Sequence, residues 1–140
     1  MRVLTIGTFD LFHHGHERLL RRCIDLTGAS GLVVALVNTD EFVERYKKIT
    51  PARKTFVRIQ DVASYVYPRS ANAHIGSHSG ETPGVIDSLR PDLIIIGSDW
   101  ARKDYLGQLG VDQDWLDDRD IGVCYVPYTK GISSTMLRGS

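Results

Sequence analysis

Apolar runs of strand length are the feature that most constrains how this chain can fold. Four are present, at residues 3–6, 32–37, 92–97 and 122–127. The run at 32–37 contains no polar alternation, and a strand of that kind is usually buried on both faces. The runs therefore predict a parallel sheet that is covered by helices.

Helical patterns fill the stretches between these runs. A first amphipathic helix is predicted from apolar residues at helical spacing: Leu19, Leu20, Cys23, Ile24 and Leu26. Further helices are predicted to start at residues 39–41, to span about residues 55–64, and to span residues 83–89 with Thr82 as N-cap. Residues 68–83 predict a loop, with a short strand at 73–75.

The alternation of strands and helices predicts an α/β fold, a single Rossmann-like doubly wound parallel sheet with helices on both faces. A chain of 140 residues is long enough for one core, so residues 1–140 are interpreted as one domain. Cys23 and Cys124 lie far apart in apolar stretches, which favours core packing over a disulfide.

Composition and charge narrow the possible partners. Lys plus Arg equal Asp plus Glu at 17 each, so the chain lacks the basic surplus with which most nucleic-acid binders neutralise phosphates. The N-terminus does not look like a signal peptide, and no apolar stretch approaches the length of a membrane span. We therefore expect a cytoplasmic protein that binds neither nucleic acid nor membrane.

A phosphate site is predicted where the first strand passes into the first helix. Ligands of doubly wound sheets bind at the carboxyl ends of the strands, and a helix N-terminus attracts anions through its N–H groups and dipole. Gly7 allows a tight turn off the strand, and Gly15 allows a phosphate to approach the backbone. His13 and His16 add side-chain donors, and a phosphate could raise their pKa and give them positive charge.

A metal site is the competing interpretation of these histidines. His13, His14 and His16 could bind a metal with His74 or His78 as a distant ligand, but no cysteine or carboxylate cluster supports it. No protein-bound metal centre is therefore predicted. His74 and His78 lie in a segment rich in Gly and Ser and are expected at the surface, where they could also contact a substrate.

The residues 7–16 read G-T-F-D-L-x-H-x-G-H, which resembles the signature of the cytidylyltransferase-like nucleotidyltransferase superfamily. Three further blocks, at residues 39–42, 97–100 and 130–135, look like those of glycerol-3-phosphate cytidylyltransferases in order and spacing. The resemblance covers nearly the whole chain. It implies transfer of CMP from CTP to a phosphorylated small alcohol such as glycerol 3-phosphate, with Mg²⁺ as cofactor and a homodimeric assembly.

The resemblance also implies roles for particular residues. His13 and His16 would contact the α-phosphate, with Asp10 beside the reacting groups and Lys47 or its neighbour Lys48 reaching both substrates. The remaining implied nucleotide contacts are Gly7, Thr8, Phe9, Gly15, Asp99, Trp100, Ser133, Ser134 and Thr135. Arg58, Tyr128 and Arg138 are the remaining residues expected to contact the acceptor or the phosphates.

Departures from the pattern leave alternatives open. Tyr128 stands where these enzymes usually carry an arginine, and Tyr67 replaces a carboxylate. Residues 81–83 and 91–93 are closer to sugar-phosphate adenylyltransferases. An adenylyltransferase that uses ATP on a sugar phosphate, and a nucleotide sensor without catalysis, therefore remain as alternatives.

Overall fold

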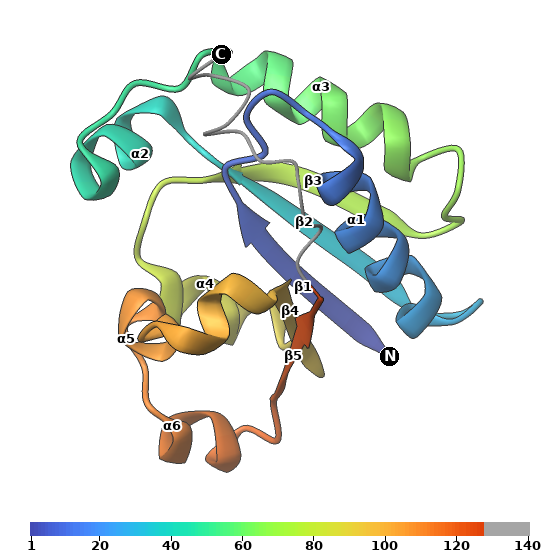
Figure 1. Cartoon of the computed structure of the whole chain (residues 1–140). Helices are drawn as coiled ribbons and strands as arrows, with labels where there is room; N and C mark the ends of the chain where they lie inside the picture. The colour runs from blue at the N-terminus through green and yellow to red at the C-terminus, as the bar shows by residue number, and fades with distance from the viewer. Residues whose placement is uncertain (128–140) are drawn as a thin grey trace.

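The computed structural model describes residues 1–127 (Figure 1). Its strands are β1 (Arg2–Gly7), β2 (Leu32–Asn38), β3 (Ala73–His78), β4 (Leu93–Gly97) and β5 (Gly122–Val126). Its α-helices are α1 (His14–Thr27), α2 (Asp40–Lys47), α3 (Thr55–Val66), α4 (Thr82–Leu89), α5 (Tyr105–Leu109) and α6 (Gln113–Asp118), and a 3-10 helix, η1, spans Ser98–Arg102.

The strands form one parallel sheet in the order β3-β2-β1-β4-β5. The chain winds outward from β1 to β2 and β3, then crosses back to β4 beside β1 and continues to β5. The winding direction therefore reverses between β1 and β4, and a crevice at the carboxyl ends of these strands is where such sheets bind ligands.

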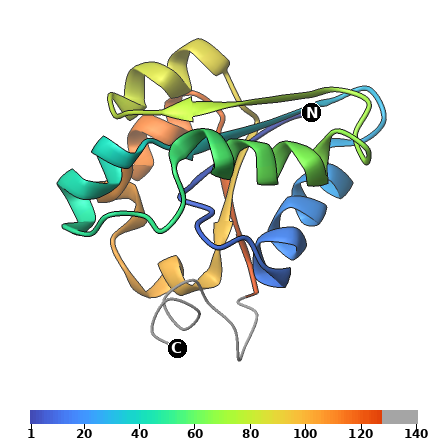
Figure 2. The same cartoon turned by 90° about the horizontal axis from the view of Figure 1, so that it is seen from above.

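Successive side chains of β1, β2 and β4 pack into two separate cores. Val3, Val33 and Ile95 pack on the face covered by α1 and α3, whereas their neighbours Leu4 and Val34 pack on the opposite face. That opposite face is covered by α4, α5 and α6, and the two layers are visible in Figures 1 and 2. The predicted doubly wound sheet with helices on both faces is confirmed.

The structure changes two local predictions and adds helices that the sequence did not predict. The strand predicted at 73–75 extends through His78, as the edge strand β3. Thr82 is the first residue of α4 and not its N-cap, because Glu81 occupies the cap position and the Thr82 hydroxyl bonds to His78. The three short helices between β4 and β5 were not predicted.

Cys23 is buried and Cys124 is partly buried, both in the core beneath α1, and both are free thiols, as the sequence predicts. Within residues 1–127, no helix is long and apolar enough to cross a membrane.

Candidate active site

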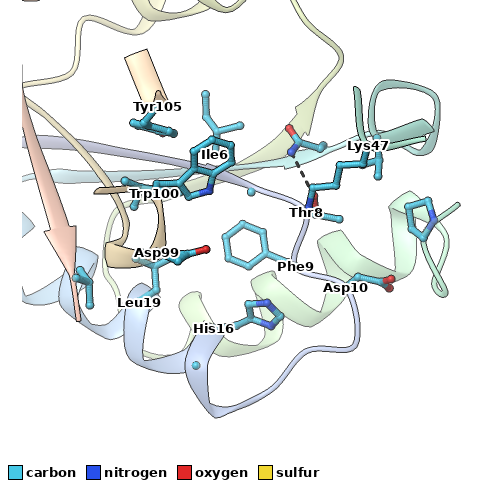
Figure 3. A pocket seen from close by; sticks show the side chains of 18 of the residues that line it. Ile6, Thr8, Phe9, Asp10, His16, Leu19, Lys47, Asp99, Trp100 and Tyr105 are labelled. Atoms are coloured by element: carbon cyan, nitrogen blue, oxygen red, sulfur yellow. Dashed lines mark hydrogen bonds between the residues drawn. The ribbon is translucent and has the colours of Figure 1, made fainter. Parts of the chain in front are cut away.

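A cavity of about 730 Å³ opens at the carboxyl ends of β1, β2, β4 and β5. Ten of the predicted site residues line it: Gly7, Thr8, Phe9, Asp10, His13, Gly15, His16, Lys47, Asp99 and Trp100. Figure 3 shows Asp99 and Trp100 on one side of the cavity and Lys47 and Asp10 on the other. The structure thus gathers segments from across the sequence at the predicted edge of the sheet.

The loop between β1 and α1 has a constrained backbone. Phe9 and Leu11 adopt positive φ values of 54° and 50°, which non-glycine residues seldom adopt. The Asp10 carboxylate holds the loop by accepting hydrogen bonds from the backbone N–H groups of Leu11, Ala52 and Arg53, at 2.7 to 3.1 Å. Asp10 is 1% exposed, so these bonds make it a residue that fixes two loops of the site to each other.

The two histidines of the motif cap α1 with their rings. His13 Nδ1 accepts from the Gly15 N–H at 3.0 Å, and His16 Nδ1 accepts from the His13 N–H at 3.2 Å. The rings stack with their centroids 3.8 Å apart. Because each Nδ1 is an acceptor, each neutral ring carries its proton on Nε2 and offers that N–H as a donor.

This capping corrects part of the sequence interpretation. The N–H groups of His13 and Gly15, which the phosphate was expected to meet, are already hydrogen-bonded to ring nitrogens. Burial lowers the pKa of His16 to about 3, helped by the nearby His13 and opposed by Asp10, and burial also lowers the pKa of His13. In the ligand-free site both rings are therefore neutral donors and not cations.

The lowered pKa predicts a pH dependence of folding stability. An unfolded histidine titrates near pH 6.5, so between about pH 6.5 and 3 the unfolded chain binds more protons at His16 than the folded chain does. The free energy of unfolding must then fall as the pH falls through this window. Urea unfolding at pH 7, 6 and 5 should show a shallower fall for His16→Asn, which does not titrate, than for the wild type.

His14→Asn is the control for this measurement. The His14 side chain is 88% exposed. Because His14→Asn keeps His16, its free energy of unfolding should fall more steeply with falling pH than that of His16→Asn. Equal slopes for the wild type and His16→Asn would contradict the assignment of a neutral, buried His16.

The structure distinguishes the two lysines at the end of α2. Lys47 is the last residue of the helix and lines the cavity. Lys48, predicted to contact substrate, is the left-handed C-cap with φ of 61° and is not among the residues that line the cavity. Lys47 is therefore the lysine placed to neutralise a bound phosphate.

Asp99 and Trp100 come from η1, directly after β4. Trp100 packs against Tyr105, with ring centroids 5.4 Å apart, and the Lys103 Nζ lies 5.2 Å from the Trp100 ring centroid. Tyr105 and Lys103 also line the cavity, and Tyr105 was not predicted. An aromatic wall with a cation beside it faces the ligand space on the β4 side.

Arg58, predicted to contact phosphate, is instead fully buried. Its guanidinium donates to the backbone oxygens of Thr8, Asn38 and Arg53 at 2.7 to 2.9 Å. It also donates to the Asp40 carboxylate at 2.6 Å. With these bonds Arg58 ties the ends of β1 and β2 to the start of α2, and it is not among the residues that line the cavity.

A polar cluster at the ends of β1, β2 and β3 escaped the sequence analysis. Asn38 and Tyr46 line the cavity beside Thr8, and the Asn38 side-chain amide donates to both hydroxyl oxygens at 3.3 to 3.4 Å. His78, expected at the surface, is 4% exposed and lies 3.0 Å from Asn38, whereas His74 is exposed as expected. The position of Asn38 directly after an apolar run was the available signal.

The remaining predicted contacts lie outside the described residues. These are Tyr128, Ser133, Ser134, Thr135 and Arg138. Within the described part of the chain, residues 1–127, no group of three or more His, Cys, Asp or Glu side chains could hold a metal ion.

Proteins of a known family are similar to this chain over most of its length. The sequence model of the family described as cytidylyltransferase-like matches residues 4–140. The chain belongs to this family. It is a nucleotidyltransferase, since the similar characterised proteins are cytidylyltransferases, adenylyltransferases and FAD synthases.

Three relatives show how substrates vary among similar proteins. A glycerol-3-phosphate cytidylyltransferase of Bacillus spizizenii is 32% identical over 98% of this chain and 94% of its own. A D-beta-D-heptose 1-phosphate adenylyltransferase of Bordetella bronchiseptica is 37% identical over 81% of this chain and 67% of its own. An FAD synthase of Korarchaeum cryptofilum is 33% identical over 75% of this chain and 69% of its own.

Among solved structures, a lipopolysaccharide core biosynthesis protein from Thermoplasma volcanium superposes with a TM-score of 0.66 at 25% identity, covering 94% of this chain and 98% of its own. The likeness supports the Rossmann-like assignment of the sheet.

Proposed function

We propose that the protein transfers CMP from CTP to a phosphorylated small alcohol, glycerol 3-phosphate or a similar polyol or sugar phosphate, and releases pyrophosphate. The observation that carries this proposal is the stacked pair His13 and His16, whose Nδ1 atoms cap α1 and whose Nε2–H groups have no hydrogen-bond partner among residues 1–127. The preference for CTP is supported by similarity to a glycerol-3-phosphate cytidylyltransferase over 98% of the chain.

The reaction requires alignment and charge stabilisation more than a base. A phosphate monoester has a second pKa near 6, so the attacking oxygen is largely ionised at neutral pH. That oxygen forms a bond to the α-phosphorus while the bond from the α-phosphorus to the bridging oxygen breaks, and pyrophosphate leaves with the electron pair. The Nε2–H groups would donate to the non-bridging α-phosphate oxygens, and Lys47 would offset the repulsion between the two substrates.

The residues present fit a Mg²⁺ ion that is bound mainly through the nucleotide. Mg²⁺ commonly keeps several waters and takes one or two carboxylates together with substrate phosphates. Asp99 is an exposed carboxylate on the cavity wall and would be the protein ligand, whereas the Asp10 carboxylate is engaged by backbone N–H groups. The ion would neutralise charge on the pyrophosphate leaving group.

We also propose that the protein acts as a cytoplasmic homodimer, without nucleic-acid or membrane partners. The balanced charge of 17 basic and 17 acidic residues supports the exclusion of nucleic acid. The dimer rests on the resemblance in sequence to glycerol-3-phosphate cytidylyltransferases.

The second candidate is an adenylyltransferase that acts on a sugar phosphate. It is favoured by the 37% identity to a heptose 1-phosphate adenylyltransferase. The third is a nucleotide sensor without catalysis, which the tyrosine at position 128 favours.

Pyrophosphate release from CTP or ATP, with Mg²⁺ and a panel of phosphorylated alcohols and sugars, tests the proposal. We expect turnover with CTP that depends on the acceptor, because the acceptor phosphate is the nucleophile. Faster turnover with ATP would establish the adenylyltransferase. A rise in melting temperature on adding nucleotide, with no turnover on any acceptor, would establish the sensor.

A further inference from the structure

A buried chain of hydrogen bonds runs from the start of α4 to the cavity. His78 Nε2 lies 3.0 Å from the Thr82 hydroxyl, and His78 Nδ1 lies 3.0 Å from Asn38 Oδ1. The Asn38 Nδ2 then donates to the hydroxyls of Thr8 and Tyr46 (the dashed line at Thr8 in Figure 3). Thr82, His78 and Asn38 are 4 to 6% exposed, so water does not complete these bonds.

The donor and acceptor types of these side chains allow hydrogen-bond donation in one direction only. An amide oxygen only accepts, so His78 must carry a proton on Nδ1 to bond with Asn38 Oδ1. Burial lowers the pKa of His78 and keeps the ring neutral. The unprotonated Nε2 therefore accepts from the Thr82 hydroxyl, and donation runs from Thr82 through His78 and Asn38 toward the cavity.

At the cavity end of this series of hydrogen bonds, one hydroxyl hydrogen has no acceptor among the described residues. Asn38 uses both amide hydrogens on Thr8 and Tyr46, whose hydroxyl oxygens lie 3.3 Å apart. The hydrogen bond between these two hydroxyls uses only one of their two hydrogens. Among the described residues no hydrogen bond takes up the other, and since both side chains line the cavity it is available to a ligand there.

The sequence resemblance implied that Thr8 contacts the nucleotide, but the place of this donor favours the acceptor. Thr8 lies next to Lys47, across the cavity from Trp100 (Figure 3). Tyr46 precedes Lys47 at the end of α2, and its hydroxyl lies 3.3 Å from that of Thr8. A nucleobase suits the aromatic wall of Trp100 and Tyr105. A phosphorylated alcohol or sugar presents oxygens and no aromatic ring, which suits a hydroxyl donor beside a lysine.

We propose that Thr82, His78 and Asn38 form a one-directional relay that presents one hydroxyl hydrogen of Thr8 or Tyr46 to an oxygen of the phosphorylated acceptor. His78 is then a positioning residue for acceptor binding. The inference rests on the proposed function, because it requires a phosphorylated acceptor in this cavity. Without His78, the Asn38 amide is free to reverse, and its oxygen would take up both hydroxyl hydrogens.

Steady-state kinetics of His78→Leu tests the relay, with CTP and glycerol 3-phosphate, or the panel member that reacts faster in the wild type. We expect the KM for the acceptor to rise about tenfold, the equivalent of one hydrogen bond, with the KM for CTP and kcat nearly unchanged. Tyr46→Phe leaves the Thr8 hydroxyl hydrogen for the acceptor, so it should raise the same KM less than His78→Leu does. His78→Asn should restore most of the loss, because its amide can donate to Asn38 from the position of Nδ1.

The control is His74→Leu, which replaces an exposed histidine of the same strand and should leave all constants as in the wild type. Nitrogen-15 NMR of the His78 ring provides a readout that needs neither a variant nor turnover, and we expect the Nδ1–H tautomer. The Nε2–H tautomer, or equal changes in both KM values for His78→Leu, would overturn the relay. Absence of turnover in the wild type on every acceptor would instead defeat the proposed function.

Discussion

His16→Asn should lose at least about 100-fold in kcat while keeping its fold. Asparagine retains an acceptor near the position of Nδ1, so the His13 N–H keeps its partner and α1 keeps its cap. The Nε2–H that would donate to the α-phosphate is removed. The measurement is the rate of pyrophosphate release at saturating CTP and acceptor.

His14→Asn is the matched control, since His14 belongs to the same motif but its side chain is 88% exposed. It should turn over at the wild-type rate. Circular dichroism and urea unfolding at pH 7 show whether His16→Asn remains folded. Wild-type turnover by a folded His16→Asn would remove the proposed role of the histidine pair.

Arg58→Met should lower the free energy of unfolding by about 2–4 kcal/mol, since each buried backbone oxygen left without a donor costs about 1–3 kcal/mol. The substitution leaves the backbone oxygens of Thr8 and Asn38 without their donor in a dry interior. It also leaves Asp40 without its guanidinium partner. Burial acts to raise the pKa of that carboxyl, but hydrogen bonds from Arg58 and Thr55, together with the charge of Arg58, outweigh it and lower the pKa.

Urea unfolding measures this loss, and Arg21→Met is its control. Arg21 forms an exposed pair with Asp25 on α1, at 56% and 55% side-chain exposure, and such pairs contribute little. The control should change the free energy of unfolding by less than about 1 kcal/mol. An equally small change for Arg58→Met would show that the guanidinium is not needed to hold the ends of β1 and β2 together.

The sequence predicted the buried parts of the fold and missed those with weak patterns. Four strands were predicted because a continuous apolar run of strand length is typical of a strand that is buried on both faces of a sheet. The edge strand β3 was predicted only in part, because its six residues include two histidines, a glycine and a serine, and its outer side is half exposed. The helices α5 and α6 have five and six residues, too few for a helical period, although Asp104 and Asp112 cap them.

The motif predicted the location of the site, but it did not predict which side chains face the cavity and which are buried in the protein. The residues adjoining β1 and β4 line the cavity as expected. Spacing does not distinguish a guanidinium that faces phosphate from one that faces three backbone oxygens, so Arg58 was misplaced. His78 was misplaced because its burial depends on β3 continuing three residues beyond the predicted end.

The amino ends of the strands contribute no residue to the cavity. Insertions can therefore be planned at that edge of the sheet without changing the residues that line the site. The connections there, such as the five residues 68–72 between α3 and β3, are largely exposed. An inserted peptide or reporter domain at residues 68–72 emerges from the edge of the sheet opposite the substrates. We expect extra length to be tolerated there, whereas one residue added between β1 and α1 would move the stacked rings off their helix cap.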